Sequence, residues 1–258
     1  MITPHLLSVA ENANTHQPLG PRDERIENER FVLWMGAGDH PSWNVVQRLR
    51  LTPGTLDSTV AEVHAILRER GRTGCTWEIG SSATPADLVE RLRARGLEDD
   101  ADPDVAALVL CAEPPPVQGV EARPARSYEE LVAARAVAWT AFGMERDADE
   151  EADRAHWGEE TELGHGRTFV ALVDGELVAA GTSTYVEGAV TLNGGAVLPH
   201  ARGRGAYRAL VRARWEDAAA RGTPTLVTQA GRMSLPILER IGFREVARIR
   251  ILVDRFGP

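Results

Sequence analysis

The stretch that decides the fold runs Val197-Leu198-Pro199-His200-Ala201-Arg202-Gly203-Arg204-Gly205-Ala206-Tyr207-Arg208-Ala209-Leu210. A strand pattern stops at a proline, turns through an Arg/Gly loop and opens into an amphipathic helix. The two loop glycines let the backbone approach a ligand closely. Free N–H groups in the first turn of a helix point at an anion, and the helix dipole adds to their effect. With its three arginines, the stretch predicts a loop that holds a diphosphate.

Other interpretations of this stretch fit less well. A dinucleotide-binding loop needs Gly-x-Gly-x-x-Gly, and Gly203-Arg204-Gly205-Ala206-Tyr207-Arg208 lacks the third glycine. No Lys-Ser/Thr follows the loop, which excludes a Walker loop. A nucleotide-linked oxidoreductase would therefore depend on Gly203-x-Gly205 alone. A glycine-rich turn with solvated arginines is the structural alternative.

A second landmark follows the loop in the chain. Thr225–Ala230 has the composition of a strand, and Ser234 is placed to cap a helix over Leu235–Ile241. Gly242-Phe243 ends that helix. Val246–Val253 then alternates apolar and polar residues, which predicts a closing strand. The order strand, anion loop, helix, strand, helix, Gly-Phe, strand is far more specific than any one of its parts.

From Ala189 to Asp254 this order resembles the GNAT superfamily of N-acetyltransferases, whose acyl-CoA loop reads Arg/Gln-x-x-Gly-x-Gly/Ala after a strand that ends near Val-x-Pro. The resemblance implies an α/β fold with a mixed α+β sheet. It also implies acetyl-CoA as co-substrate, with the pantetheine and oxyanion at the strand end and the diphosphate at the loop. The implied contacts are Gly195, Ala196, Val197, Arg202, Gly203, Arg204, Gly205, Ala206, Tyr207 and Arg208. Tyr207 stands where the family signature has Gly or Ala.

Two positions depart from the family pattern. Leu238 stands where the family often has a tyrosine that protonates the departing thiolate, and Gly231 stands where an asparagine is common. These departures motivate a second hypothesis, a non-catalytic acyl-CoA-binding or regulatory protein. The first hypothesis is an N-acetyltransferase that acts on a small amine or a peptide N-terminus by direct, sequential transfer.

No residue is assigned as the general base. Four side chains are candidates, and each has a structural interpretation that is at least as good. Glu187 is a solvated carboxylate in a turn, Tyr185 a core tyrosine and Asn193 a strand-pairing asparagine. His165 is a loop histidine between two glycines, which can titrate near neutral pH. The catalytic residues are therefore unknown at this stage.

The Pro-rich segment 113–119 marks a domain boundary, because consecutive prolines favour an extended spacer. The predicted organisation is an extension over 1–27, a degenerate GNAT-like domain over 28–112, and the GNAT acetyltransferase domain over 120–258. The two halves repeat one order of elements, which favours a tandem duplication over coincidence.

In the first half, Arg30–Gly36 and Asn44–Leu51 form a predicted hairpin. The elements expected after it are a helix at Thr59–Arg70, a strand at Cys75–Ile79, a capped helix at Thr84–Arg95 and a strand at Ala106–Cys111. No Gly-x-Gly precedes the helix at Thr59, so this half has no anion loop. The resemblance implies that it is a structural remnant.

In the second half, helices are predicted at Tyr128–Phe142 and Asp149–Leu163. A hairpin over Thr168–Val173 and Glu176–Tyr185 turns at Asp174-Gly175. The acidic run from Glu145 to Glu162 lies where the family builds its acceptor pocket, but a solvated helix face is the preferred interpretation. Four apolar residues there are candidates for an acceptor wall, although core packing is the commoner role: Trp139, Phe142, Met144 and Trp157.

The composition limits the partners and the cellular location that we expect for this protein. The 258 residues carry a net charge of −9, and every basic residue is arginine. This balance argues against nucleic-acid binding and mildly favours a cationic partner. No apolar run is long enough for a membrane span and no export signal is visible, so we expect a cytoplasmic protein. Cys75 and Cys111 are expected to be buried and reduced, no metal site is expected, and a homodimer is an open option.

Overall fold

The structure is a computed structural model and describes residues 2–144 and 150–257. It divides into two compact units. The N-terminal unit comprises Met1–Leu108, Gln229–Pro236 and Glu245–Pro258, and the C-terminal unit comprises Val109–Thr228 and Ile237–Arg244. The predicted domains were continuous in sequence, whereas these units are not.

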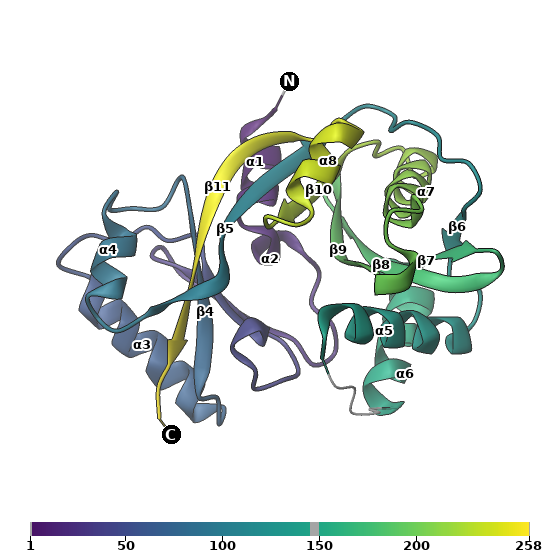
Figure 1. Cartoon of the computed structure of the whole chain (residues 1–258). Helices are drawn as coiled ribbons and strands as arrows, with labels where there is room; N and C mark the ends of the chain where they lie inside the picture. Colours follow the sequence, from purple (N-terminus) through teal and green to yellow (C-terminus); the bar gives the residue numbers. More distant parts are fainter. Residues whose placement is uncertain (1, 145–149, 258) are drawn as a thin grey trace. The chain divides into compact units, whose positions relative to one another are not determined.

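The N-terminal unit combines antiparallel and parallel strands with covering helices (Figure 1). Its strands follow the order β1-β2-β3-β4-β11-β5. The pairs β1–β2, β2–β3 and β4–β11 are antiparallel, and the pair β3–β4 is parallel. Its elements are α1 (Pro4–Glu11), α2 (Ala13–His16), β1 (Glu24–Glu27), β2 (Val32–Met35), η1 (Pro41–Trp43), β3 (Asn44–Gln47), α3 (Leu56–Glu69), β4 (Gly74–Gly80), α4 (Leu88–Arg93), β5 (Glu98–Leu110) and β11 (Arg244–Arg255).

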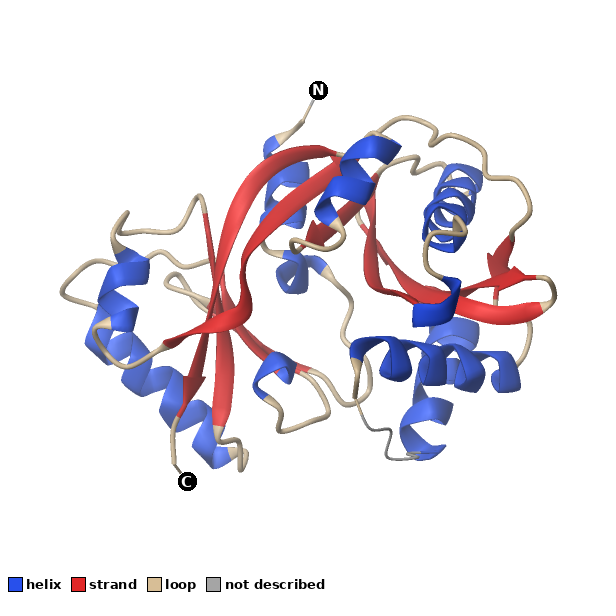
Figure 2. Ribbon diagram, viewed as in Figure 1, coloured by secondary structure: helices blue, strands red, loops and turns tan. Residues whose placement is uncertain are grey.

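The C-terminal unit is a second mixed arrangement of strands and helices (Figure 2). Its strands follow the order β10-β9-β8-β7-β6, and only the β9–β10 pair is parallel. Its elements are β6 (Glu121–Pro124), α5 (Tyr128–Phe142), α6 (Glu150–Gly158), the π-helical turn η2 (Glu159–Leu163), β7 (Gly166–Val173), β8 (Glu176–Val186), β9 (Ala189–Val197), η3 (Pro199–Ala201), α7 (Ala206–Ala220), β10 (Leu226–Ala230) and α8 (Leu235–Ile241). The last two have residues in both units.

The helices of the C-terminal unit cover its strands from two sides. In Figure 1, α7 and α5 lie on opposite faces of β7, β8 and β9. The α7 side buries Phe169, Ala171 and Leu210, and the α5 side buries Ala134 and Val170. This agrees with strand geometry, because neighbouring residues of a strand face opposite sides of the sheet.

Most local predictions are confirmed. The helices at Tyr128–Phe142 and Leu235–Ile241 and the strand at Ala189–Val197 have the predicted ends. The hairpin turn has left-handed backbone at both central residues, with φ of 53° at Asp174 and 84° at Gly175. Such a turn matches the twist of the two strands that it joins.

Several predicted elements differ in extent, and two of these differences have a clear structural reason. The helix expected from Thr84 begins at Leu88, because Thr84 instead pairs in a bridge with Arg50 and donates its N–H to Leu49. The strand β5 begins at Glu98 rather than Ala106. Its acidic first half is largely outside the core, so it carries no alternating pattern that the sequence could reveal.

The partner of the last strand was not predicted. The strand over Val246–Val253 exists, as β11, but it pairs with β4 of the N-terminal unit from Ile249↔Gly80 to Arg255↔Gly74. An alternating pattern specifies which face of a strand is buried and leaves its neighbour open. The predicted range 120–258 therefore includes a strand that the structure assigns to the other unit.

The prediction for the cysteines is half wrong. Cys75 is buried, and burial raises the pKa of its thiol well above the ordinary value, but Cys111 is exposed. Cys111 directly follows the last residue of β5, so the apolar run that precedes it does not bury it. Both thiols are free.

No helix within residues 2–144 and 150–257 has both the length and the apolar character that crossing a membrane requires.

Candidate functional site

The candidate site begins at an irregularity in the pairing of β8 with β9. Ala180 pairs with Ala196, but Thr182 pairs with Asn193, so two residues of β9 stand opposite Gly181. This is a β-bulge, which bends a strand and re-aims its groups. Gly194 takes up the distortion in the left-handed region, with φ of 59°. The bulge lies next to the predicted contacts Gly195, Ala196 and Val197.

Beyond the bulge, one edge of β9 is open. Parallel pairing with β10 covers Leu226↔Val190 and Val227↔Thr191, and no later pair is formed in the part of the chain that the structure describes. Leu198 donates its N–H to Val178 of β8 over 2.9 Å. Because alternate N–H groups of a strand point the same way, the N–H of Val197 points to the open edge. Val197 thus has a main-chain donor at the open edge, and the ligand contact that the family resemblance implies for it stays a prediction.

The loop after β9 leads directly into α7. A short 3₁₀ turn over Pro199–Ala201 precedes Gly203 and Gly205, which have φ of 81° and 89°. Gly205 is the N-cap of α7, and no side chain caps the helix there. The first turn contains no acidic residue. The N–H groups of Ala206, Tyr207 and Arg208 therefore point out of the helix without an acceptor among the described residues, as an anion site requires.

The three loop arginines are not equivalent. Arg204 forms an ion pair with Asp174, with Nη2 and Oδ2 2.6 Å apart. Arg202 bends back to the strand end, where its Nε donates to the carbonyl of Val197 over 3.4 Å. Neither Arg202 nor Arg208 pairs with a carboxylate among residues 2–144 and 150–257. These two exposed cations are the ones free to meet a phosphate.

Tyr207 lies against the bulge. Gly195 has no side chain, and a Cβ added there would lie 2.8 Å from Cε2 and 3.6 Å from Cζ of Tyr207. The phenol end of the ring therefore rests on the backbone of Gly195. This explains how a tyrosine fits where the family signature has a small residue: the glycine on β9 provides the space that the loop position does not.

Arg214, which the sequence analysis did not identify, is buried under the same bulge. It is 1% exposed, and its Nη1 lies 2.9 Å from the position of a Cβ at Gly181. Its Nε donates to the carbonyl of Leu210 over 3.2 Å, and Nη1 lies 3.5 Å from the carbonyl of Thr182. In the described chain no carboxylate pairs with it.

The charge of Arg214 persists at neutral pH. Burial lowers the pKa of its guanidinium to about 10, so the group stays protonated. Burial also raises the pKa of the Tyr207 phenol, and the nearby Arg214 cation acts in the opposite direction. The spacing of Tyr207, Leu210 and Arg214 places all three on one helix face. That spacing was the available signal, but arginine is usually solvent-exposed and the burial of Arg214 was missed.

The two departures from the family pattern have structural explanations. Leu238 is 1% exposed and packs in the core. Gly231 lies against Asp102, because a Cβ there would be 2.1 Å from the Asp102 Oδ2. That same oxygen accepts the N–H of Arg232 over 2.9 Å. No asparagine side chain fits at 231 without moving Asp102.

The four candidate bases have different surroundings. Tyr185 donates its hydroxyl to Asp217, and Asn193 donates its amide to Thr184 Oγ1 over 3.0 Å, so both have structural partners. Glu187 is exposed in the turn between β8 and β9. The Nδ1 atom of His165 is buried and has no hydrogen-bond partner among the described residues. The main-chain carbonyl of His165 accepts the N–H of Tyr185 over 2.9 Å, so these two candidates are neighbours in the fold.

The acidic helix is only partly solvated. Asp153 is buried and lies 2.6 Å from Nε of Arg135, and Glu160 lies 3.1 Å from Nε2 of His156. Burial alone would lower the pKa of His156, but its contacts with Glu159 and Glu160 outweigh burial and raise that pKa to about 9. The interpretation as a solvated face is therefore wrong for Asp153 and Glu160. Glu145–Asp149 lie outside the described residues.

The four residues proposed as an acceptor wall differ in their exposure to solvent. Phe142 and Met144 are 57% and 47% exposed, so they are not core residues. Trp139 and Trp157 are half-buried. The buried stripe of α5 consists instead of Leu131, Ala134 and Val137.

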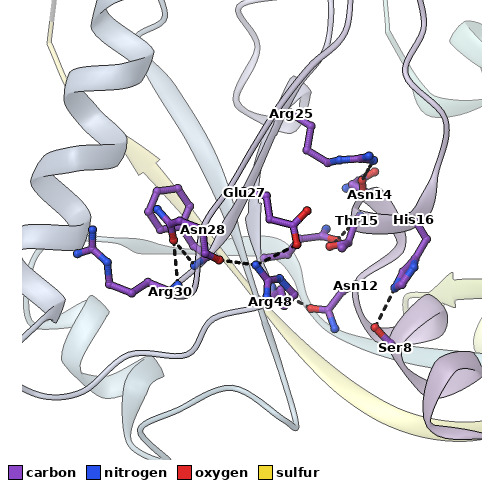
Figure 3. Close-up of polar contacts among 12 residues, drawn as sticks. Ser8, Asn12, Asn14, Thr15, His16, Arg25, Glu27, Asn28, Arg30 and Arg48 are labelled. Atoms are coloured by element: carbon purple, nitrogen blue, oxygen red, sulfur yellow. Dashed lines mark hydrogen bonds and ion pairs between the residues drawn. The ribbon is translucent and has the colours of Figure 1, made fainter.

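In the N-terminal unit, the edge of β3 that faces β4 corresponds to the open edge of β9, and other side chains of the chain cover it. Registered pairing of β3 with β4 ends at Val46↔Trp77, and the side chains of α1 and α2 lie beyond it (Figure 3). Asn12 accepts the N–H of Arg48 over 2.9 Å, and Thr15 donates its N–H to Gln47 Oε1 over 3.2 Å. The chain thus occupies with its own side chains the edge that is open in the C-terminal unit.

No group of three or more His, Cys, Asp or Glu side chains that could hold a metal ion occurs in the described ranges.

Comparison with known proteins agrees with this geometry. Residues 130–243 match the model of the acetyltransferase (GNAT) family, a range that contains β9, the loop and α7. No curated protein matches the chain.

Several solved structures share the fold over most of their length. A GCN5-related N-acetyltransferase from Kribbella flavida is 19% identical, with 92% of this chain and 91% of that chain covered and a TM-score of 0.66. A GCN5-related N-acetyltransferase from Sphaerobacter thermophilus is 16% identical, with 90% and 83% covered and a TM-score of 0.65. A tandem GNAT protein from the clavulanic acid biosynthesis pathway is 16% identical, with 98% and 94% covered and a TM-score of 0.61. The predicted α/β fold with a mixed sheet is confirmed.

Proposed function

Since residues 130–243 form a domain of the GNAT acetyltransferase family, we propose that this chain transfers the acetyl group of acetyl-CoA to a primary amine. The acceptor is a small molecule or a peptide N-terminus, and the transfer is direct and sequential. Acetyl-CoA lies with its diphosphate at the loop and its thioester at the β9 bulge.

One observation carries the proposal: the first turn of α7 is uncapped and follows a loop of two left-handed glycines. Three outward N–H groups and the helix dipole offer a binding site for a diphosphate. Arg202 and Arg208 add charge without competing carboxylates. The N–H of Val197 faces the open edge at the end of β9, the strand that leads into this loop. In the proposed complex this N–H lies near the thioester, and the loop holds the diphosphate.

The chemistry follows from that placement. The nitrogen of a neutral amine attacks the thioester carbon, and the carbonyl oxygen becomes an oxyanion. The Val197 N–H points to the open edge where this oxygen would lie, and a preorganised donor of that kind contributes roughly 2.7–4 kcal/mol to barrier lowering. The tetrahedral intermediate then collapses, the C–S bond breaks and CoA leaves.

The binding part of the proposal can be tested with one substitution and a matched control. Gly205→Glu places a carboxylate at the mouth of α7, and like-charge repulsion should abolish acetyl-CoA binding measured by calorimetry. It also strains a residue at φ 89°, with Val117 Cγ1 3.1 Å from the new Cβ. Gly222→Glu, at the other end of the same helix with φ 77° and open surroundings, introduces a similar charge and strain. Unchanged affinity in Gly205→Glu would refute the loop assignment.

A second function, acyl-CoA binding without catalysis, is favoured by one observation. Leu238 is packed in the core where the family often has its acid, and Gly231 has no room for a larger side chain. Release of CoA thiol with a panel of amines separates the two functions. Tight acetyl-CoA binding without turnover on any amine would favour the binding protein.

A further inference from the structure

We propose that the Tyr207 hydroxyl donates the proton to the CoA sulfur as the thioester breaks, and that Arg214 is the positioning residue for that hydroxyl. This inference rests on the proposed acetyl-CoA site. It assigns the acid to the first turn of α7, at a position other than 238.

The placement of the ring is the first argument. The two ring atoms nearest to Gly195 are Cε2, at 2.8 Å from its Cβ position, and Cζ, at 3.6 Å, which carries the hydroxyl. The hydroxyl end of the ring, rather than its Cβ end, therefore lies toward the bulge, where the proposed thioester lies. It forms no hydrogen bond with any described residue, so both its proton and its lone pairs are available to a ligand.

The second argument is the uncompensated charge of Arg214. Its Nη2 lies 3.6 Å from the same Cβ position at Gly195 that the Tyr207 ring approaches. Guanidinium and phenol therefore flank one point of β9 from the same face. A buried cation without a carboxylate is costly unless negative charge appears beside it. The thiolate and the phenolate are negative charges that arise there only during the reaction.

Two glycines make this arrangement possible. Gly181 and Gly195 lie on neighbouring strands, and a Cβ at either would clash, with Arg214 Nη1 at 2.9 Å and with Tyr207 Cε2 at 2.8 Å. The absence of a side chain at these two positions thus leaves space for Arg214 and Tyr207. The i to i+7 spacing of Tyr207 and Arg214 on α7 keeps them on one face, two turns apart.

The step balances as follows. The amine lone pair forms the C–N bond, and the electrons of the C–S bond pass to sulfur. The Tyr207 O–H bond breaks and its proton moves to sulfur, which leaves as the thiol of CoA. The resulting phenolate, stabilised by Arg214, takes up the proton that the acylated nitrogen releases through solvent. Tyr207 ends the cycle protonated.

A test that needs no acceptor is the ionisation of the thiol of bound CoA. A hydroxyl that donates to the sulfur favours the thiolate. The ultraviolet absorbance of the thiolate is titrated in the complex of the full chain with CoA, and the desulfo-CoA complex is subtracted to remove the protein's own thiols. Free thiols ionise near pH 8.5. The bound thiol should ionise about 10- to 100-fold more readily, as expected for one hydrogen bond to a charged group.

Tyr207→Phe is the matched variant, because it keeps the ring on Gly195 and removes the hydroxyl alone. It should return most of the thiol ionisation to the value of free CoA, and Arg214→Met should shift it the same way. If Arg214→Met does not fold, the thiol titration of Tyr207→Phe is sufficient to test the proposal.

Three results would overturn the inference, and they have different meanings. Identical titrations of the wild type and Tyr207→Phe, with desulfo-CoA bound by both, reject the role of Tyr207 and leave the acetyl-CoA site standing. Tighter binding of desulfo-CoA by Tyr207→Gly would show instead that the ring occupies the path of the pantetheine. Failure of the wild type to bind either CoA or desulfo-CoA rejects the proposed function itself, and the inference with it.

Discussion

The hydroxyl of Tyr185 on β8 donates a hydrogen bond of 2.7 Å to Asp217 Oδ2 on α7. The same carboxylate accepts from Arg167 Nη1 over 2.8 Å and from Arg221 Nε over 3.0 Å. Burial and the Asp217 contact both raise the pKa of Tyr185. A phenol that is neutral and already bonded to a carboxylate is unsuited to be a base, so Tyr185 is a structural residue that ties α7 to the strands.

This network predicts a stability defect without a direct catalytic one. Asp217→Asn leaves two arginines without their anion and should lower the free energy of unfolding by roughly 1–3 kcal/mol. Urea unfolding measures it. Glu216→Gln is the control, because Glu216 is 56% exposed and its ion pair with Arg212 should contribute little. An equal loss in both variants would contradict the assigned role of Asp217.

The loop arginines should contribute unequally to acetyl-CoA affinity. Arg202→Gln and Arg208→Gln each remove a cation that has no carboxylate partner, and each should weaken binding about 10- to 100-fold. Arg204→Gln should have a smaller effect, because Arg204 already pairs with Asp174. Calorimetry at low and high salt measures these effects, and added salt should shrink all of them. A dominant loss in Arg204→Gln would contradict this ranking.

The pair of His156 and Glu160 predicts a pH-dependent contribution to stability. The folded pKa of His156, about 9, lies above its ordinary value of 6.5. Its contribution is therefore complete below about pH 6.5 and is lost as the pH rises through about 9. The pKa of Glu160 is lowered despite burial, by its contacts with His156 and Thr168. Its contribution is complete above about pH 4.5 and is lost at lower pH.

His156→Gln should therefore cost roughly 1–3 kcal/mol at about pH 5.5 and almost nothing at about pH 10. Urea unfolding at the two pH values gives the comparison. His200→Gln is the surface control, since the contact of His200 with Glu176 joins side chains that are 58% and 62% exposed. A cost for His156→Gln that does not change with pH would point to packing rather than charge.

Glu78 predicts a pH dependence of a different kind. Burial raises its pKa to about 7, opposed by a hydrogen bond with Gln229. Because the folded pKa exceeds the ordinary value of 4.5, stability falls as the pH rises from about 4.5 to about 7. Glu78→Gln should remove this loss and raise the free energy of unfolding by about 1–2 kcal/mol at pH 8. Glu69→Gln, at an exposed carboxylate of the same unit, is the control. A gain that persists at pH 4 would be inconsistent with titration of Glu78.

Local signals predicted most elements of the fold. The helical spacing of apolar residues in Tyr128–Phe142, the turn Asp174-Gly175 and the terminating Gly242 are local features, so their consequences can be read from sequence. The strand β6 and the helices α1 and α2 were not predicted. They are short, and α1 and α2 are held by contacts with β3 and the residue after it, distant in sequence.

The parts of the candidate site that the main chain forms could be predicted from the sequence. The glycines at 203 and 205 have the left-handed conformation that the loop pattern implies. The buried charge was not predictable, because the environment of Arg214 is created by Gly181 on a strand more than thirty residues away. A side chain's burial depends on what faces it, and a single sequence does not reveal which strand that is.

The last strand of the chain completes the sheet of the first unit, as the pairing of β11 with β4 shows. Neither half of the sequence is therefore a self-sufficient folding module. The sheet of the first unit cannot be completed until β11 has left the ribosome, so a premature stop before β11 would damage the half that was translated first. Cutting such a gene at its midpoint would separate β11 from the strand β4 with which it pairs.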